Sequence, residues 1–61
     1  EVVEFNSSLG RVRVKIKRLY EKGISVSPEF EDCRRIAIEN HIPLQSVYQI
    51  IEAEAQRRLS E

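Results

Sequence analysis

Four cationic side chains stand at alternate positions early in the chain and could together bind a polyphosphate. They are Arg11, Arg13, Lys15 and Lys17. Successive side chains of a strand point to opposite faces, so in a strand these four would share one face at intervals of about 6.8 Å. Guanidinium and ammonium groups make strong charge-assisted hydrogen bonds with phosphate oxygens. The alternative is a solvated face whose charges deter edge-to-edge pairing of strands, and the pattern alone favours this alternative.

Three carboxylates follow further along the chain, at Glu29, Glu31 and Asp32. In the first turn of a helix they could hold a hard divalent cation that also touches phosphates. Carboxylates are also common at helix N-termini because they interact favourably with the helix dipole, and this interpretation is the stronger one for the cluster alone. A metal nucleotide needs both cations and carboxylates, so the two groups support each other.

Other residue types that carry chemistry are scarce. Cys33 falls on an apolar stripe and is predicted to be a core residue, while His41 is predicted to be a helix cap or a surface residue. The sequence has no Ser and His pairing, no Gly-rich phosphate loop and no metal-binding His pair. The 61 residues alone are therefore predicted to bind and not to catalyse. A lone cysteine cannot form an internal disulfide, which favours a reducing, cytoplasmic setting.

The cationic row belongs to a predicted antiparallel sheet. Val2 to Phe5 reads as a first edge strand, and residues 11–17 alternate cations with β-branched side chains that would be buried. The buried set is Val12, Val14 and Ile16. Residues 20–23 end in the Gly that a tight turn favours, and residues 24–27 resume the period of two. The sequence predicts a three-stranded meander.

Two helices are predicted after the strands. Pro28 is suited to the first helical position, and residues 28–40 carry an apolar stripe at intervals of three and four. That stripe is Phe30, Cys33, Ile36 and Ala37. The next helix begins at Pro43, and its stripe is Val47, Tyr48, Ile51, Ala55 and Leu59. It is predicted to pack on the sheet or on a partner chain. The fold class is therefore α+β, in one small domain.

Composition limits the function classes. Ten Lys and Arg balance ten Asp and Glu, so no net field would draw the chain to nucleic acid or to a membrane surface. No apolar run approaches the roughly 20 residues of a membrane span. A domain of this size buries only about 60% of its unfolded surface, which favours help from an oligomer or a neighbouring domain. The chain opens directly on strand-like sequence, so we expect residues 1–61 to be one domain of a longer protein.

The order of these motifs resembles a known family. The strand Val12-Arg13-Val14-Lys15-Ile16 precedes the run Val-Ser-Pro-Glu-Phe-Glu-Asp-Cys-Arg-Arg-Ile-Ala at residues 26–37, and Ile42-Pro43-Leu44 and Val47-Tyr48 follow. This arrangement resembles the C-terminal domain of the LarC family, the nickel insertion proteins of nickel-pincer nucleotide biosynthesis. The resemblance covers roughly residues 10–48, and the Pro-Glu-aromatic-Glu-Asp-Cys-Arg run is its most distinctive part.

The resemblance implies that the full-length protein is a nickel-inserting cyclometallase of the lyase class. It would place nickel in a pyridinium bis-thiocarboxylate mononucleotide, in a CTP-dependent reaction that requires Mg or Mn, and the product would serve lactate racemase. The C-terminal domain would bind CTP and form a homo-oligomer, while a larger N-terminal region would handle the nickel. Neither nucleic acid nor a membrane is an expected partner.

The resemblance also suggests site residues. Arg13, Lys15, Lys17 and Arg34 are predicted to contact the nucleotide, Glu29 and Asp32 are predicted to contact the divalent cation, and no catalytic residue is predicted. Two departures stand out. Phe30 replaces the usual Tyr and lacks its hydroxyl, and His41 stands where Gly is common, which puts a left-handed helix cap in doubt.

Two other functions remain open. A purely structural oligomerisation module would assemble subunits without a nucleotide site. A nucleic-acid-binding role would use the cationic row, but two of the four aromatic side chains lie on apolar helical stripes, which leaves a poor stacking platform.

Overall fold

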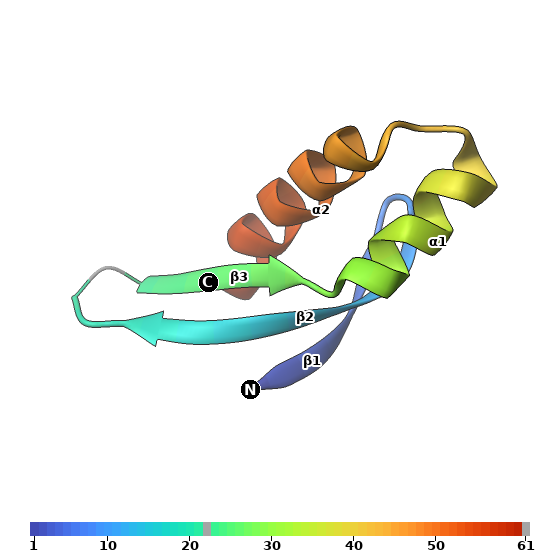
Figure 1. Cartoon of the computed structure of the whole chain (residues 1–61). Coiled ribbons are helices and arrows are strands. Elements are labelled where there is room, and N and C mark those ends of the chain that lie inside the picture. The colour runs from blue at the N-terminus through green and yellow to red at the C-terminus, as the bar shows by residue number, and fades with distance from the viewer. Residues whose placement is uncertain (22, 61) are drawn as a thin grey trace.

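A computed structural model describes residues 1–21 and 23–60 of the chain. Three strands precede two helices (Figure 1): β1 Val2–Ser7, β2 Gly10–Leu19, β3 Gly23–Pro28, α1 Phe30–Asn40 and α2 Leu44–Leu59. The strands form one antiparallel sheet in the order β1-β2-β3. The predicted α+β class is therefore confirmed. The turn predicted over residues 20–23 includes Lys22, which lies outside the described residues.

β2 is the central strand, and its register places apolar side chains opposite one another. Phe5 pairs with Val12 and Val3 with Val14 across β1, while Ile16 pairs with Val26 across β3. Val12 and Val14 are buried as predicted, and Ile16 is half-buried. β1 continues two residues beyond the predicted end at Phe5, because its ladder with β2 extends to the pair of Ser7 and Gly10.

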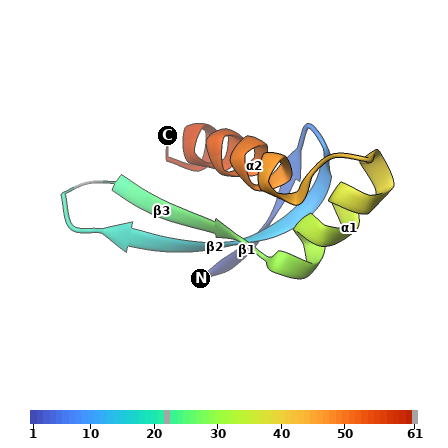
Figure 2. The same ribbon diagram turned by 45° about the horizontal axis from the view of Figure 1, so that its top comes forward.

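The helices pack on one face of the sheet, and the single core lies between them and the strands (Figure 2). α2 lies across the sheet and packs on it, which confirms one of the two predicted alternatives, and α1 continues from the end of β3 beside β2. The core residues are Phe5, Val12, Val14, Cys33, Ile36, Val47, Ile51 and Ala55. Cys33 is fully buried, as predicted, and burial raises the pKa of its thiol. No helix among residues 1–21 and 23–60 is long and apolar enough to span a membrane.

Polar contacts fasten α2 to the strands. The amide and hydroxyl of Ser8, in the turn between β1 and β2, both donate to the carboxylate of Glu54. Gln56 donates from Nε2 to the carbonyl of Ile24 at 3.0 Å. Both contacts hold α2 against one face of the sheet. The opposite face, which carries the exposed side chains of Arg11, Arg13, Lys15 and Lys17, is called the open face below.

The sequence predicted that the first helix begins at Pro28, and this prediction was wrong. Pro28 is the last residue of β3, paired with Val14, and α1 begins two residues later at Phe30. The Glu29 amide still donates to the carbonyl of Arg13 at 2.8 Å, so the strand ladder continues past Pro28. The fixed φ of proline is compatible with a strand, and its missing N–H is tolerated because β3 is an edge strand.

His41 forms the left-handed cap that the sequence had put in doubt. Its φ and ψ are 56° and 43°, and the following amide of Ile42 donates to the carbonyl of Ala37 at 3.0 Å. This bond satisfies a carbonyl that the last helical turn would otherwise leave unpaired. The doubt about a non-glycine cap was therefore wrong, because the hydrogen bonds form in spite of the side chain.

We expect truncation of Ile36 to destabilise the fold much more than truncation of Ile38. Ile36 is fully buried, whereas Ile38 is 59% exposed on the same helix. Ile36→Val should lower the free energy of unfolding by about 0.5–1.5 kcal/mol, and Ile38→Val should change it by less than about 0.5 kcal/mol. Urea denaturation followed by circular dichroism measures both. Equal effects would contradict the assigned core face of α1.

His41→Gly should stabilise the chain. The left-handed conformation costs an ordinary L-residue roughly 1–2 kcal/mol, a cost that glycine avoids. Glycine also loses more conformational entropy on folding, so we expect a net gain of about 0.5–1 kcal/mol. His41→Val should destabilise, since a β-branched residue is strained at this φ. Thermal unfolding of both variants is the measurement, and a higher melting temperature for the Val variant would contradict the cap.

Candidate anion-binding site

The predicted cationic row lies on the open face of the sheet. Arg11, Arg13, Lys15 and Lys17 are all exposed and alternate along β2 with residues that point into the core. Their cross-strand neighbours divide them into two pairs. On β1, Arg13 faces Glu4 and Arg11 faces Asn6, whereas on β3 Lys15 faces Ser27 and Lys17 faces Ser25. The two pairs therefore offer different chemistry.

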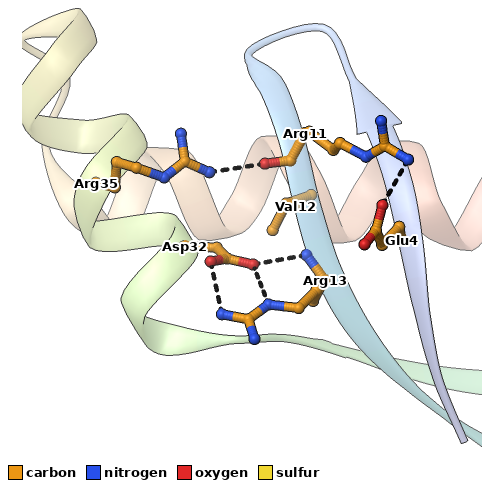
Figure 3. A pocket seen from close by; sticks show the side chains of 6 residues that line it. All are labelled: Glu4, Arg11, Val12, Arg13, Asp32 and Arg35. Atoms are coloured by element: carbon orange, nitrogen blue, oxygen red, sulfur yellow. Dashed lines mark hydrogen bonds and ion pairs between the residues drawn. The ribbon is translucent and has the colours of Figure 1, made fainter.

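Arg13 is held by Asp32 at the start of α1 (Figure 3). Nε and Nη2 of the guanidinium donate to the two carboxylate oxygens, each at 2.9 Å, and the backbone amide of Arg13 donates to Oδ2 at 2.8 Å. The Asp32 side chain is 13% exposed and that of Arg13 is 54% exposed. The Arg13 hydrogen bonds lower the pKa of Asp32 to about 2, against the opposing effect of burial. The same contact raises the pKa of Arg13.

This contact forms because β3 ends at Pro28, opposite Val14, so residues 10–13 of β2 extend beyond it. No strand of the described chain pairs with these residues on that side, and α1 forms hydrogen bonds with them instead. Glu29 donates its amide to the Arg13 carbonyl, Asp32 accepts from the Arg13 amide, and Arg35 donates from Nη2 to the Arg11 carbonyl at 2.9 Å. The role of Arg35 was not predicted from the sequence. The spacing of three between Glu29, Asp32 and Arg35 was the signal that could have found it, because residues at this spacing neighbour one another on a helix.

A hollow of about 190 Å³ adjoins this contact. Its lining is Glu4, Arg11, Val12, Arg13, Asp32 and Arg35. Figure 3 shows Arg13 and Arg35 near Asp32, while the Arg11 guanidinium is turned toward β1. Nη2 of Arg11 lies 2.5 Å from Oε1 of Glu4, and both of these side chains are more than half exposed. Such an exposed pair contributes little to stability.

The two lysines line a second hollow, of about 410 Å³, together with Glu1, Val2, Ile16, Ser25 and Ser27. No ion-pair partner lies within 4.0 Å of Lys15 or Lys17 among residues 1–21 and 23–60. Each lysine stands directly across the ladder from a serine hydroxyl. Ammonium and hydroxyl groups together can donate several hydrogen bonds to one phosphate.

The remaining predicted site residues lie elsewhere. Arg34 is exposed on α1 and lines neither hollow, and Glu29 is half-buried just before the helix. Both oxygens of Asp32 already accept hydrogen bonds from Arg13. In the part of the chain that the structure describes, no group of three or more His, Cys, Asp or Glu side chains is placed to hold a metal ion. A cation at Glu29 and Asp32 therefore stays a prediction, and at Asp32 it would compete with the hydrogen bonds from Arg13.

The sequence matches the family described as nickel insertion protein over residues 1–48. A protein of Geotalea uraniireducens, named provisionally as a nickel insertion protein, is 49% identical over 51 residues, which are 84% of this chain and 13% of that relative. No solved structure is significantly similar to the chain.

Two relatives carry a fuller name, pyridinium-3,5-bisthiocarboxylic acid mononucleotide nickel insertion protein. The one from Desulfitobacterium hafniense is 34% identical over 90% of this chain and 14% of its own length. The one from Thermotoga petrophila is 31% identical over 84% of this chain and 13% of its own length. The chain therefore belongs to the nickel insertion protein family, and it spans about one seventh of the length of these curated relatives.

The Arg13 and Asp32 pair should make stability fall in acid. The folded pKa of Asp32 is about 2 and its ordinary value is 3.8. A depressed carboxyl pKa stabilises the fold above pH 4, and this contribution is lost as the pH falls to 2. Asp32→Asn should cost about 1 kcal/mol at pH 7, because solvent at the exposed Arg13 weakens the pair, and almost nothing at pH 2.

Urea unfolding of both proteins at the two pH values measures this difference. Other carboxylates titrate alike in both proteins and cancel. Glu31→Gln is the matched control, since this neighbouring carboxylate is exposed and forms no ion pair within the described residues. A cost of Asp32→Asn that stays constant from pH 7 to 2 would rule out the charge as its cause.

Proposed function

We propose that residues 1–61 form the nucleotide-binding, oligomer-forming C-terminal domain of a CTP-dependent nickel insertion enzyme. The membership of the family supports nickel insertion into a cofactor precursor as the activity of the whole protein. The whole protein would take a pyridinium mononucleotide as its substrate, and nickel would be the inserted ion. This domain would bind and position a nucleotide while other parts of the protein carry out the insertion. A cytoplasmic location stays a prediction.

The observation that carries this proposal is the pair of lysines on β2. Lys15 and Lys17 have no ion-pair partner among the described residues, and they face the hydroxyls of Ser27 and Ser25 in a hollow of about 410 Å³. That volume falls within the roughly 300–1,000 Å³ of small-molecule sites. Arg13, by contrast, is fixed by Asp32. We therefore assign the phosphates of CTP to the lysines, while the contacts of Arg13 and Arg34 with this nucleotide stay predictions from the sequence.

A divalent cation would reach this site with the nucleotide. Mg or Mn bound to two phosphates would neutralise part of their charge and fix their geometry. Mg in particular is usually held by one or two carboxylates and by substrate phosphates, with water completing its shell. Glu29 is the predicted carboxylate that needs no broken contact, because its side chain makes no ion pair in the described part of the chain.

Assembly of several copies is the second part of the proposal. Phe30 and Ile38 are 49% and 59% exposed on α1, and Tyr20 is 94% exposed at the end of β2. Apolar side chains that are exposed singly are normal, whereas contiguous apolar patches mark interaction surfaces. These residues are therefore available to an assembly, and the assembly itself stays a prediction. An assembly that ignores nucleotide would support the alternative of a purely structural module.

Titration calorimetry with CTP, with and without Mn, tests the nucleotide site. We expect metal-dependent binding that is stronger for CTP than for ATP. Lys15→Ala and Lys17→Ala should each weaken CTP binding by about tenfold or more, since a charge-assisted hydrogen bond contributes about 1.5–3 kcal/mol.

Arg18→Ala is the matched control, because it removes one exposed cation from the same strand but from the opposite face of the sheet. An equal loss of CTP affinity in Arg18→Ala would mean that the effect comes from the net charge alone. Absence of CTP binding by a folded chain would overturn the nucleotide site and leave assembly as the role of the domain.

A further inference from the structure

We propose that the hollow beside the Arg13 and Asp32 pair is a second anion site, which binds the phosphate monoester of a mononucleotide. This inference rests on the proposed function, because it assigns the two cationic regions of one sheet face to two different nucleotides. The lysine hollow would hold the triphosphate of CTP. The arginine hollow would hold the single phosphate of the pyridinium mononucleotide.

The size and charge of the hollow favour a small anion. Its volume of about 190 Å³ lies below the roughly 300–1,000 Å³ of sites that enclose a whole drug-sized ligand. Three arginines and two carboxylates line it, which leaves a net charge of +1. Guanidinium groups bind phosphate in a fixed forked geometry, which makes arginine the residue of choice for phosphate recognition.

Two of the arginines are held in place and still have donors to spare. Arg13 commits two of its five N–H groups to Asp32, which leaves three. Arg35 commits one to the Arg11 carbonyl and one, at 3.4 Å, to Glu39, which also leaves three. Figure 3 shows these two side chains on the Asp32 side of the hollow. Asp32 does not repel the ligand strongly, because both of its oxygens are neutralised by Arg13.

The third arginine can change its partner when an anion arrives. Arg11 pairs with Glu4 across β1, and the two side chains are 69% and 58% exposed. An ion pair with this exposure contributes little to stability, so a phosphate dianion can replace Glu4 as the partner of Arg11. The move would bring the Arg11 guanidinium over the hollow and leave Glu4 exposed to solvent on β1.

The two hollows are too far apart for one triphosphate. Arg11 and Arg13 are centred on position 12 of β2, and Lys15 and Lys17 are centred on position 16. Four residues of antiparallel strand span about 14 Å. Neighbouring phosphates of a nucleotide share a bridging oxygen and lie much closer together than this. Two phosphate-bearing molecules therefore fit the face better than one, and the fuller name of two relatives already includes a mononucleotide.

NMR titration of the 15N-labelled chain with inorganic phosphate, at constant chloride, tests the site. We expect saturable shifts of the side-chain Nε–H signals of Arg11, Arg13 and Arg35. Arg35→Gln should weaken binding by about tenfold, equivalent to about 1.4 kcal/mol. Arg57→Gln, which removes another exposed charge, from α2, should leave the binding unchanged. Arg35→Lys should bind with intermediate strength, because it keeps the charge and loses the fork.

Two further ligands identify the group that binds. Nicotinic acid mononucleotide, a pyridinium mononucleotide with one ring carboxylate, should produce the same arginine shifts as phosphate. Nicotinic acid, which keeps the carboxylate and lacks the phosphate, should not. Equal binding of both would overturn the assignment to a phosphate monoester, and so would phosphate shifts that are unchanged by Arg35→Gln.

Addition of CTP with Mg separates this inference from the proposed function. Arginine shifts that persist at saturating CTP support two separate sites. Displacement of phosphate from the arginines by CTP would overturn the second site and assign both hollows to one nucleotide. Phosphate binding at the arginines without any CTP binding would support the arginine site while refuting the CTP site.

Discussion

The contact between Arg13 and Asp32 determines how the two halves of this small fold meet. β2 is longer than either of its neighbours, so part of its edge would face water once β3 ends at Pro28. Asp32 accepts hydrogen bonds from the amide and the guanidinium of Arg13, and the amide of Glu29, three residues earlier, donates to the Arg13 carbonyl. This set of bonds fixes the start of α1 against β2. The position of α1 then places Cys33 and Ile36 in the core, where α2 can pack on them.

The same contact divides the cationic row into parts with different chemistry. Without it, four similar cations would alternate along an open strand. Because Asp32 holds Arg13 and Glu4 pairs with Arg11, the arginine half of the row is partly neutralised, and Arg13 is fixed in its geometry. The lysine half faces serine hydroxyls and has no acidic partner in residues 1–21 and 23–60. An interaction that stabilises the fold therefore also divides the positive charge of the open face into a paired half and an unpaired half within the described residues.

Periodicity in the sequence predicted most of the fold and only part of the site. The period of two in β2 identified its buried and exposed faces, and the apolar stripes of α1 and α2 identified most of the core, because these signals are local. Phe30 was wrongly placed on the buried stripe, since it is the first residue of α1 and is 49% exposed. The end of β3 was misplaced, since Pro28 is compatible with a strand or a helix and only its pairing with Val14 decides between them. The partner of Asp32 lies 19 residues away, and no local pattern specifies a pairing over that distance.

The open face also explains how a domain with so small a core can carry binding sites. The buried side chains of β2 point toward α2, and the cations alternate with them on the opposite face. A ligand bound by the cations would contact exposed side chains. Replacement of these side chains leaves no cavity in the core, so most of them can be changed without a large loss of stability. Asp32 and Arg35 are the exceptions, because both line the arginine hollow and both hydrogen-bond the backbone of β2 at its junction with α1. Changes at Asp32 or Arg35 would alter the hollow and the fold together, whereas changes at Lys15 would separate them.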